Sequence, residues 1–230
     1  MQEELAVNEN IAIAMEGRRD AYRFFSSALL HEFTVEQIRQ MRQIAPDQGS
    51  QSQVEEYFSR IRRYLAHPGP DPRIALAVDY ARVFLSAGIY EGRTAEPYES
   101  AFTGPEYLLM QEARDQVVTI YRENGVDIDA ELHMPEDHLG LELEFMSLMA
   151  DKTARELRAG DGEAATVRNL AIVQRDFCND HILNWIDNLT EKVDEFAKLP
   201  LYPALMRIIK GYVQDDVALM DELAQAASDC

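Results

Sequence analysis

Apolar side chains recur along this chain at the three- and four-residue spacing of amphipathic helices. The spacing is first seen at Ile11, Met15, Tyr22, Phe25 and Leu29. It predicts a helix over about residues 8–30. Because the same spacing continues to the end of the chain, broken only by short polar or Pro- and Gly-containing stretches, the pattern predicts an all-α fold.

The next three helices are predicted over residues 35–45, 54–65 and 71–86. Thr34 and Gln37 have the spacing of a capping box, which opens the first of them. The run Pro68-Gly69-Pro70 ends the second, because proline cannot continue a helix.

Residues 87–104 form the longest stretch without a helical period, and they contain three glycines and one proline. We predict an irregular loop here, and long loops often carry function. The following helix is expected to open at Pro105-Glu106 and to end at Gly125, a candidate for a left-handed cap.

The most apolar helix is predicted over residues 135–160, with apolar side chains on nearly every face, as in a helix surrounded by others. Pro135 suits a first helical position, and Glu136 and Asp137 place negative charge at the positive helix end. Asp137 and His138 thus stand where a central helix begins. Such a pair is most often a cap and a surface histidine, and here it is also a candidate binding site.

Helical spacing over about residues 163–196 is longer than a typical globular helix, so we expect a break within it. Phe177, His181 and Trp185 share one face at four-residue spacing and are predicted to lie in the core. A last helix follows Pro200.

Composition agrees with this helical pattern. The 230 residues include only 11 Gly and 9 Pro, and 47% of them are hydrophobic. There is no internal repeat or composition break, so we predict one domain over residues 1–230, a bundle of about eight to nine helices.

The formal net charge is −19, and no basic cluster interrupts it, which argues against nucleic acid as a partner. The acidity suits a basic partner, or it serves only to keep the protein in solution. Cys178 and Cys230 suggest neither a disulfide framework nor a zinc site, so we expect a reducing cytoplasm. The sequence has no run of about 18 apolar residues and no secretory signal, so we expect neither a membrane span nor export.

Residue patterns for catalysis are missing. The Glu-x-x-His pairs of dinuclear metal sites, phosphate-binding loops and nucleophile elbows are all absent from the sequence. Cys178 and His181 would give a metal only two ligands, so a buried thiol near a core histidine is favoured. His138 and Glu142 could form an acid/base pair, although a salt bridge or a satisfied histidine is favoured. We predict no enzyme activity, metal or cofactor.

Several stretches, taken in order, resemble one known family. They are Asp79-Tyr80-Ala81-Arg82-Val83-Phe84, Glu96-Pro97-Tyr98-Glu99-Ser100, Pro135-Glu136-Asp137-His138, the spacing of Phe177, His181 and Trp185, and Leu201-Tyr202-Pro203-Ala204-Leu205. The chain resembles the cytoplasmic chaperones for molybdenum-dependent reductases, the TorD/DmsD type. The resemblance implies a cytoplasmic, TorD-like helical chaperone. Such a chaperone would bind the twin-arginine leader of a reductase before export, with the folded body of the precursor as a further contact.

The resemblance also implies a leader-binding site. Its predicted residues are Arg18, Tyr22, Tyr80, Arg82, Phe84, Pro97, Tyr98, Glu99, Pro135, Asp137 and His138. We expect the Asp137 carboxylate to face a leader arginine and a neutral His138 imidazole to make one hydrogen bond. The loop over residues 87–104 is expected to be mobile and to close over the groove. In it, Tyr98 and Phe102 stand where some family members have tryptophans.

The alternative is a helical structural or regulatory protein that binds another basic or amphipathic segment. The sequence leaves open which reductase is served and whether a nucleotide or the molybdenum cofactor binds. It also leaves open whether the chain is a monomer or a homodimer, which the resemblance would allow to be domain-swapped.

Overall fold

The computed structural model describes residues 2–45, 53–85, 95–104, 108–127, 133–159 and 164–227. These residues form ten α-helices and one π-helical segment, and none of them forms a strand. The prediction of an all-α fold is therefore confirmed. The helices group into two compact units, and the expectation of one domain stays a prediction. Within the described ranges, no helix is long and apolar enough to cross a membrane.

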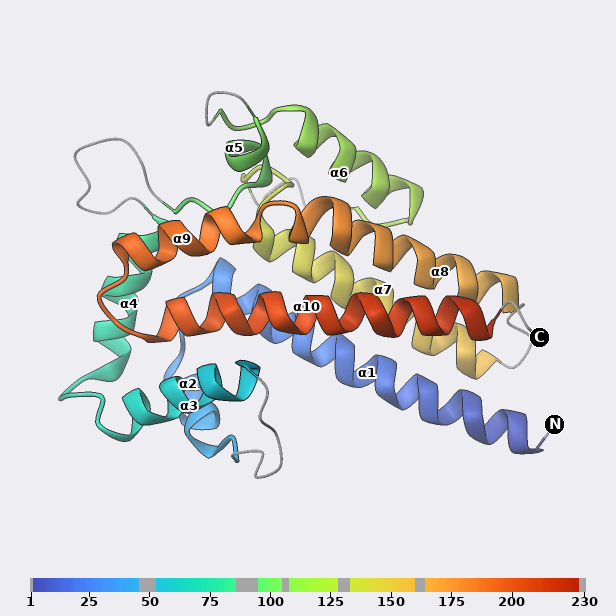
Figure 1. The fold of residues 1–230 in the computed structure, drawn as a ribbon, viewed down its shortest axis with the longest axis horizontal. Coiled ribbons are helices and arrows are strands. Elements are labelled where there is room, and N and C mark those ends of the chain that lie inside the picture. Colours follow the sequence, from blue (N-terminus) through green and yellow to red (C-terminus); the bar gives the residue numbers. More distant parts are fainter. Residues whose placement is uncertain are drawn as a thin grey trace. The chain divides into compact units, whose positions relative to one another are not determined.

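Unit 1 comprises Met1–Leu30, Tyr98–Asn184 and Gln214–Cys230. Its elements are α1 (Gln2–Leu30), α5 (Glu99–Thr103), α6 (Glu112–Glu123), α7 (Leu139–Ala159), α8 (Ala164–Phe177), the π-helical η2 (Cys178–Leu183) and the second part of α10 (Leu201–Ala226). The long helices α1 and α7 pack side by side, and α8 packs against α7 (Figure 1). Small side chains such as Ala12, Ala154 and Ala171 in the shared core suit this close packing.

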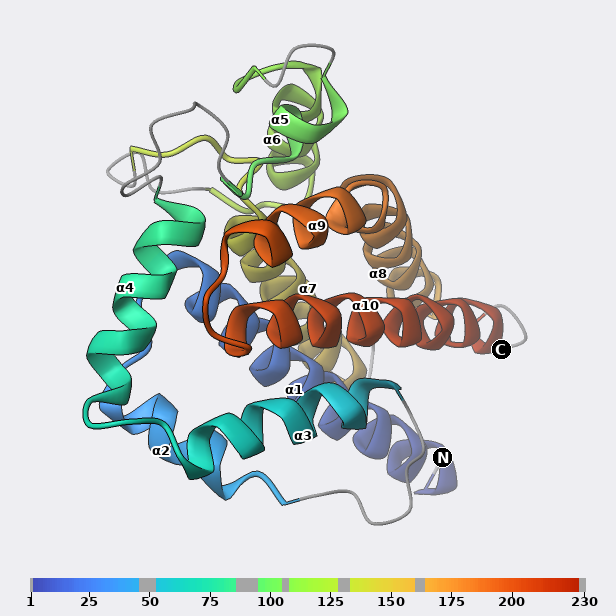
Figure 2. The ribbon, with the colours of Figure 1, turned by 60° about the vertical axis from the view of Figure 1, so that its left-hand side comes forward.

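Unit 2 comprises His31–Pro97 and Trp185–Val213. Its elements are α2 (Val35–Gln43), α3 (Gln53–Ala66), α4 (Pro72–Phe84), α9 (Ile186–Phe196) and the first part of α10. Helix α2 packs against α3, and α4 contacts α9 (Figure 2). Where α3 approaches α10, a side chain at Gly211 would meet Val54 at 2.6 Å, so this approach requires glycine.

Several predicted features are confirmed. The Thr34 hydroxyl accepts from the Gln37 N–H at 3.2 Å, and the Gln37 side chain accepts from the Thr34 N–H at 2.9 Å, which completes the capping box of α2. The expected break in the long C-terminal helix lies at η2 and the turn that follows it. Phe177 and Trp185 are core residues, each 1% exposed, and His181 is buried beside them.

The beginning of the central helix was predicted wrongly. Helix α7 begins at Leu139 rather than at Pro135. The backbone of His138 instead pairs with that of Tyr98 in an isolated antiparallel bridge. A contact with a distant part of the chain therefore replaces the first helical turn, and sequence periodicity does not detect such contacts.

The segment before α6 also differs from the prediction. Helix α6 begins later than predicted, at Glu112, and residues 108–111 lie outside any helix. Met110 has a left-handed backbone with φ of 59°, which a helix cannot contain. In the predicted loop, residues 95–104 are not wholly irregular, because they include α5. Residues 87–94 of that loop lie outside the described residues.

Candidate functional site

The structure brings two of the predicted motifs together in unit 1. In the Tyr98–His138 bridge, the Glu99 N–H donates to the Asp137 carbonyl at 2.9 Å, and the Ser100 N–H donates to Asp137 Oδ2 at 2.8 Å. The rings of Tyr98 and His138 meet edge to face, with centroids 5.0 Å apart. Two segments far apart in sequence therefore meet at one corner, at the beginning of α7.

His138 caps the helix that follows it. Its carbonyl accepts from the N–H groups of Leu141 and Glu142, and its Nδ1 accepts from the Gly140 N–H at 3.0 Å. Burial lowers the pKa of His138 to about 3, so the imidazole is neutral near pH 7. A neutral His138 was expected from the positive end of the helix, whereas here burial is the cause of the lowered pKa. A Cβ at Gly140 would lie 2.6 Å from Leu30, which explains the glycine after this histidine.

Three buried carboxylates gather behind the bridge: Glu99, Asp137 and Glu142, here called the carboxylate cluster. The Glu99 carboxylate lies 3.0 Å from His181 Nδ1 and accepts from Asn184 Nδ2 at 3.0 Å. In contrast, no described donor reaches Asp137 Oδ1 or either oxygen of Glu142. Burial raises the pKa of Glu142 well above its usual value, and the neighbouring Glu99 and Asp137 raise it further.

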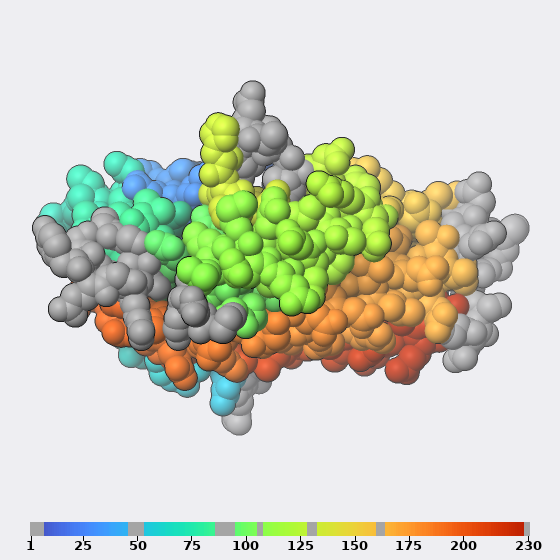
Figure 3. Space-filling view, turned by 90° about the horizontal axis from the view of Figure 1, so that it is seen from above, coloured from blue at the N-terminus to red at the C-terminus, as the bar shows by residue number. Residues whose placement is uncertain are grey.

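The surface beside the bridge is more accessible. Tyr98, Pro135 and Glu136 are half-buried. Arg114 on α6 makes a two-point contact with Glu136, at 2.6 and 2.8 Å, and this contact lowers the pKa of the Glu136 carboxyl. Figure 3 shows the α5–α6 segment on the surface of unit 1, in green.

Arg18 and Tyr22, also predicted for the leader site, lie in a separate buried network of unit 1. Arg18 makes a bidentate contact with Asp216, at 2.5 and 2.7 Å, and the Tyr22 hydroxyl donates to the same carboxylate at 2.7 Å. Both were predicted as leader-site residues, but their contact with Asp216 was not predicted. Cys178 is a buried free thiol 3.7 Å from the Tyr22 hydroxyl, in agreement with its predicted structural role.

Tyr80 and Phe84 belong to unit 2, where both are 4% exposed. Their rings pack on each other, with centroids 5.4 Å apart, and on Tyr202, at 6.0 and 5.3 Å. Arg82 pairs at 2.6 Å with buried Asp79. The structure thus places these predicted site residues in or beside the core of unit 2, while Pro97 is buried just before the bridge.

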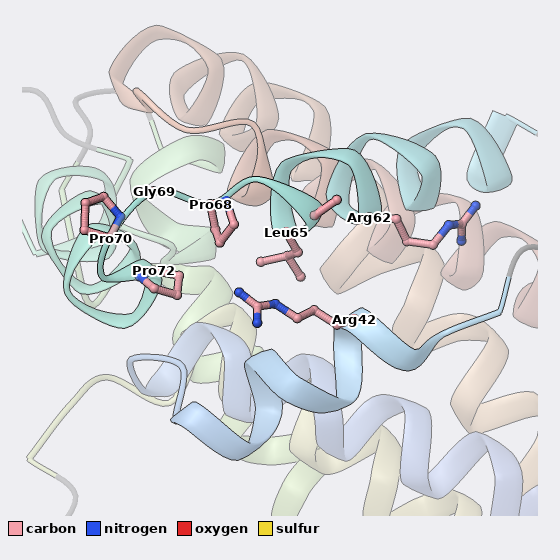
Figure 4. Close-up of a pocket in the computed structure, with 8 residues that line it drawn as sticks. Arg42, Arg62, Leu65, Pro68, Gly69, Pro70 and Pro72 are labelled. Atoms are coloured by element: carbon pink, nitrogen blue, oxygen red, sulfur yellow. The ribbon is translucent and has the colours of Figure 1, made fainter.

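A cavity of about 630 Å³ in unit 2 contains none of the predicted site residues. The ends of α2 and α3 and the turn around Gly69 line it (Figure 4). Arg42 points into this cavity, whereas the Arg62 guanidinium turns away and binds Glu55 and Ser59. One inward arginine above a proline-rich turn makes a weaker candidate site than the carboxylate cluster.

The contacts of Glu99 and Glu142 were not predicted from the sequence. Glu142 stands between Leu141 and Leu143 in a run that is apolar on nearly every face, and this was the available signal that it would be buried. Of the interpretations considered for His138 and Glu142, the histidine with its own hydrogen bond agrees with the structure, because His138 Nδ1 accepts from the Gly140 N–H. Across the described parts of the chain, no three His, Cys, Asp or Glu side chains are placed to hold a metal.

Comparisons with known proteins identify the family of this chain. Chaperone protein TorD of Psychrobacter sp. is 24% identical over 221 residues, which cover 93% of this chain and 96% of that protein. Proteins of the same name from Vibrio cholerae and Photobacterium profundum are each 26% identical over 227 residues, which cover 94% and 96% of this chain and 98% of each relative. The model of the nitrate reductase delta subunit family matches residues 47–191, more than half of the chain. The chain is therefore a member of the nitrate reductase delta subunit family.

Proposed function

We propose that this chain is a cytoplasmic maturation chaperone that binds the twin-arginine leader of a molybdenum-dependent oxidoreductase precursor. The observation that carries the proposal is similarity over almost the whole length of both chains to proteins named chaperone protein TorD. It is not an enzyme in this proposal, and its task is to hold the precursor until the cofactor is loaded.

Charge supports a basic partner. The chain has 41 Asp and Glu against 22 Lys and Arg, so its field attracts a segment with two arginines and repels acidic ones. Attraction of this kind raises the rate of encounter, while specificity requires a defined contact.

We place that contact at Asp137 and His138. Asp137 Oδ1 lacks a donor in the described part of the chain, so a guanidinium would supply the missing hydrogen bond. Because Asp137 is 0% exposed, the Tyr98 segment must move aside before an arginine can reach it. The half-buried Tyr98 and Pro135 would then flank the bound leader.

Unit 1 also exposes an apolar run that suits an amphipathic leader. Leu108, Leu109 and Met110 are consecutive, and their exposed fractions are 50%, 37% and 59%. Acidic Glu112 and Asp115 follow in the first turn of α6. An apolar surface next to acidic side chains complements a peptide that combines apolar residues with arginines.

Titration calorimetry with a synthetic twin-arginine leader tests the proposal. We expect Asp137→Asn to weaken binding more than tenfold, because a desolvated charge pair is worth about 2 to 5 kcal/mol. Asp180→Asn is the matched control, since it removes the same charge from an exposed site in unit 1. If the parent protein does not bind the leader, the chaperone proposal fails. Equal weakening by both variants would mean that Asp137 contributes only its negative charge and makes no specific contact with the leader.

A further inference from the structure

Glu142 occupies a position that an ionised carboxylate would not tolerate well. It lies in the first turn of α7 and is 0% exposed. No N–H or O–H group in the described residues donates to either of its oxygens, although the Glu99 carboxylate is within hydrogen-bonding reach. Two carboxylates in such contact repel each other unless one of them carries a proton.

We propose that Glu142 is a protonated positioning residue, whose carboxyl O–H donates to Glu99 and so holds the Tyr98–Ser100 segment against the beginning of α7. The proton gives Glu142 one hydrogen bond that it otherwise lacks among the described residues, and Glu99 is able to accept it. Glu99 accepts from Asn184 on one oxygen and contacts His181 through the other, and each carboxylate oxygen has a second lone pair. Glu142 acts on the candidate site only through Glu99.

The charges around Glu142 favour this proton. The titratable groups that face it are Glu99 on α5, Asp137 in the turn before α7, Tyr121 on α6 and Cys178 on η2, with His181 of η2 behind Glu99. None of these groups is an arginine or a lysine. Burial and the same carboxylates also raise the pKa of Tyr121 well above its usual value, in keeping with a cluster short of positive charge.

The proton makes stability depend on pH in a defined direction. The folded protein holds the Glu142 proton more tightly than the unfolded chain, whose glutamate has a pKa near 4.5. The stabilisation that this proton provides is complete below that value and is lost as pH rises toward the folded pKa. Over that window the unfolding equilibrium constant rises by up to about tenfold per pH unit.

Glu142→Gln is the direct test, because an amide has the shape of a protonated carboxyl and keeps a donor for Glu99. Urea unfolding between about pH 5 and 8 should show the parent losing stability relative to Glu142→Gln as pH rises. Glu144→Gln, on the same helix but half-buried, should keep the pH dependence of the parent. A pH-independent difference between parent and Glu142→Gln would overturn the proposal, as would a Glu142→Gln protein that does not fold.

Infrared spectroscopy gives a second readout. At neutral pH the parent should show the C=O absorption of a protonated carboxylic acid, and Glu142→Gln should lack it. Persistence of the absorption in Glu142→Gln would contradict a proton on Glu142. Neither measurement uses a leader, so this inference can fail or hold independently of the proposed function.

Discussion

Unit 1 buries carboxylates at two sites that are neutralised in different ways. Asp216 is held by the two-point contact with Arg18 and by the Tyr22 hydroxyl, so its charge and hydrogen bonds are satisfied within the protein. The carboxylate cluster of Glu99, Asp137 and Glu142 has no arginine or lysine contact among the described residues. A satisfied buried pair is a structural feature, whereas under-satisfied polar groups point to function.

The difference also shows in pH dependence. Glu142 favours folding at low pH, because its proton is lost as pH rises. His138 has the opposite sign, because the unfolded chain takes up a proton near pH 6.5 while the folded imidazole resists protonation down to about pH 3. Of these two buried groups, Glu142 lowers the free energy of unfolding as pH rises, and His138 lowers it as pH falls.

The largest expected loss of stability comes from breaking the buried pair of Arg18 and Asp216. Asp216→Asn leaves the buried Arg18 guanidinium without its counter-charge, and removal of one partner from a buried pair costs about 3 to 5 kcal/mol. Urea unfolding measures this loss. Asp180→Asn, the exposed control, should change stability by less than about 0.5 kcal/mol. A loss at Asp216 no larger than at Asp180 would show that the pair contributes little.

The aromatic core of unit 2 provides a second contrast. Phe84→Ala should cost about 3 to 5 kcal/mol of stability, because its ring packs between Tyr80 and Tyr202. Leader affinity, measured below the melting temperature, should stay within about twofold, since binding is proposed at Asp137. Lost affinity in a protein of unchanged stability would move the proposed site to Tyr80 and Phe84, which the family resemblance also implied.

Near neutral pH, the smallest effect is expected at His138, whose contribution changes only on acidification. Its neutral state contributes stability above about pH 6.5, and this stability is lost as pH falls toward 3, by up to about 1.4 kcal/mol per pH unit. His138→Gln should therefore flatten the acid limb of a plot of unfolding free energy against pH. His67→Gln, in the loop between α3 and α4 of unit 2, serves as the comparison. An unchanged acid limb would mean that protonation of His138 is not coupled to unfolding.

Sequence periodicity predicted the helices well because the apolar spacing that it detects is the same feature that drives their packing. The Thr34 cap was predicted from the spacing of Thr34 and Gln37, and the break near η2 from the unusual length of the helical stretch. The beginning of α7 was missed, since the Tyr98–His138 bridge joins residues forty positions apart. Local patterns contain no information on such a contact.

The candidate site was predicted in part. The two motifs that meet at the bridge were identified from their resemblance to a family, but nothing in the sequence indicated that Glu99 and Glu142 would lie together. Arg18 was expected at the leader site from the family resemblance, whereas it pairs with Asp216, nearly two hundred residues away. Burial of charged residues depends on tertiary pairing, and a single sequence does not reveal that pairing.

The central claim is that the carboxylate cluster lacks a cation which a leader arginine supplies at Asp137. A double-mutant cycle by titration calorimetry tests it most directly, with parent and Asp137→Asn proteins each titrated with a twin-arginine leader and with the same leader carrying glutamines instead. We predict a coupling energy of about 2 kcal/mol or more, because the arginines should matter much less once Asp137 is gone. Additive losses, with no coupling beyond about 0.5 kcal/mol, would contradict the claim.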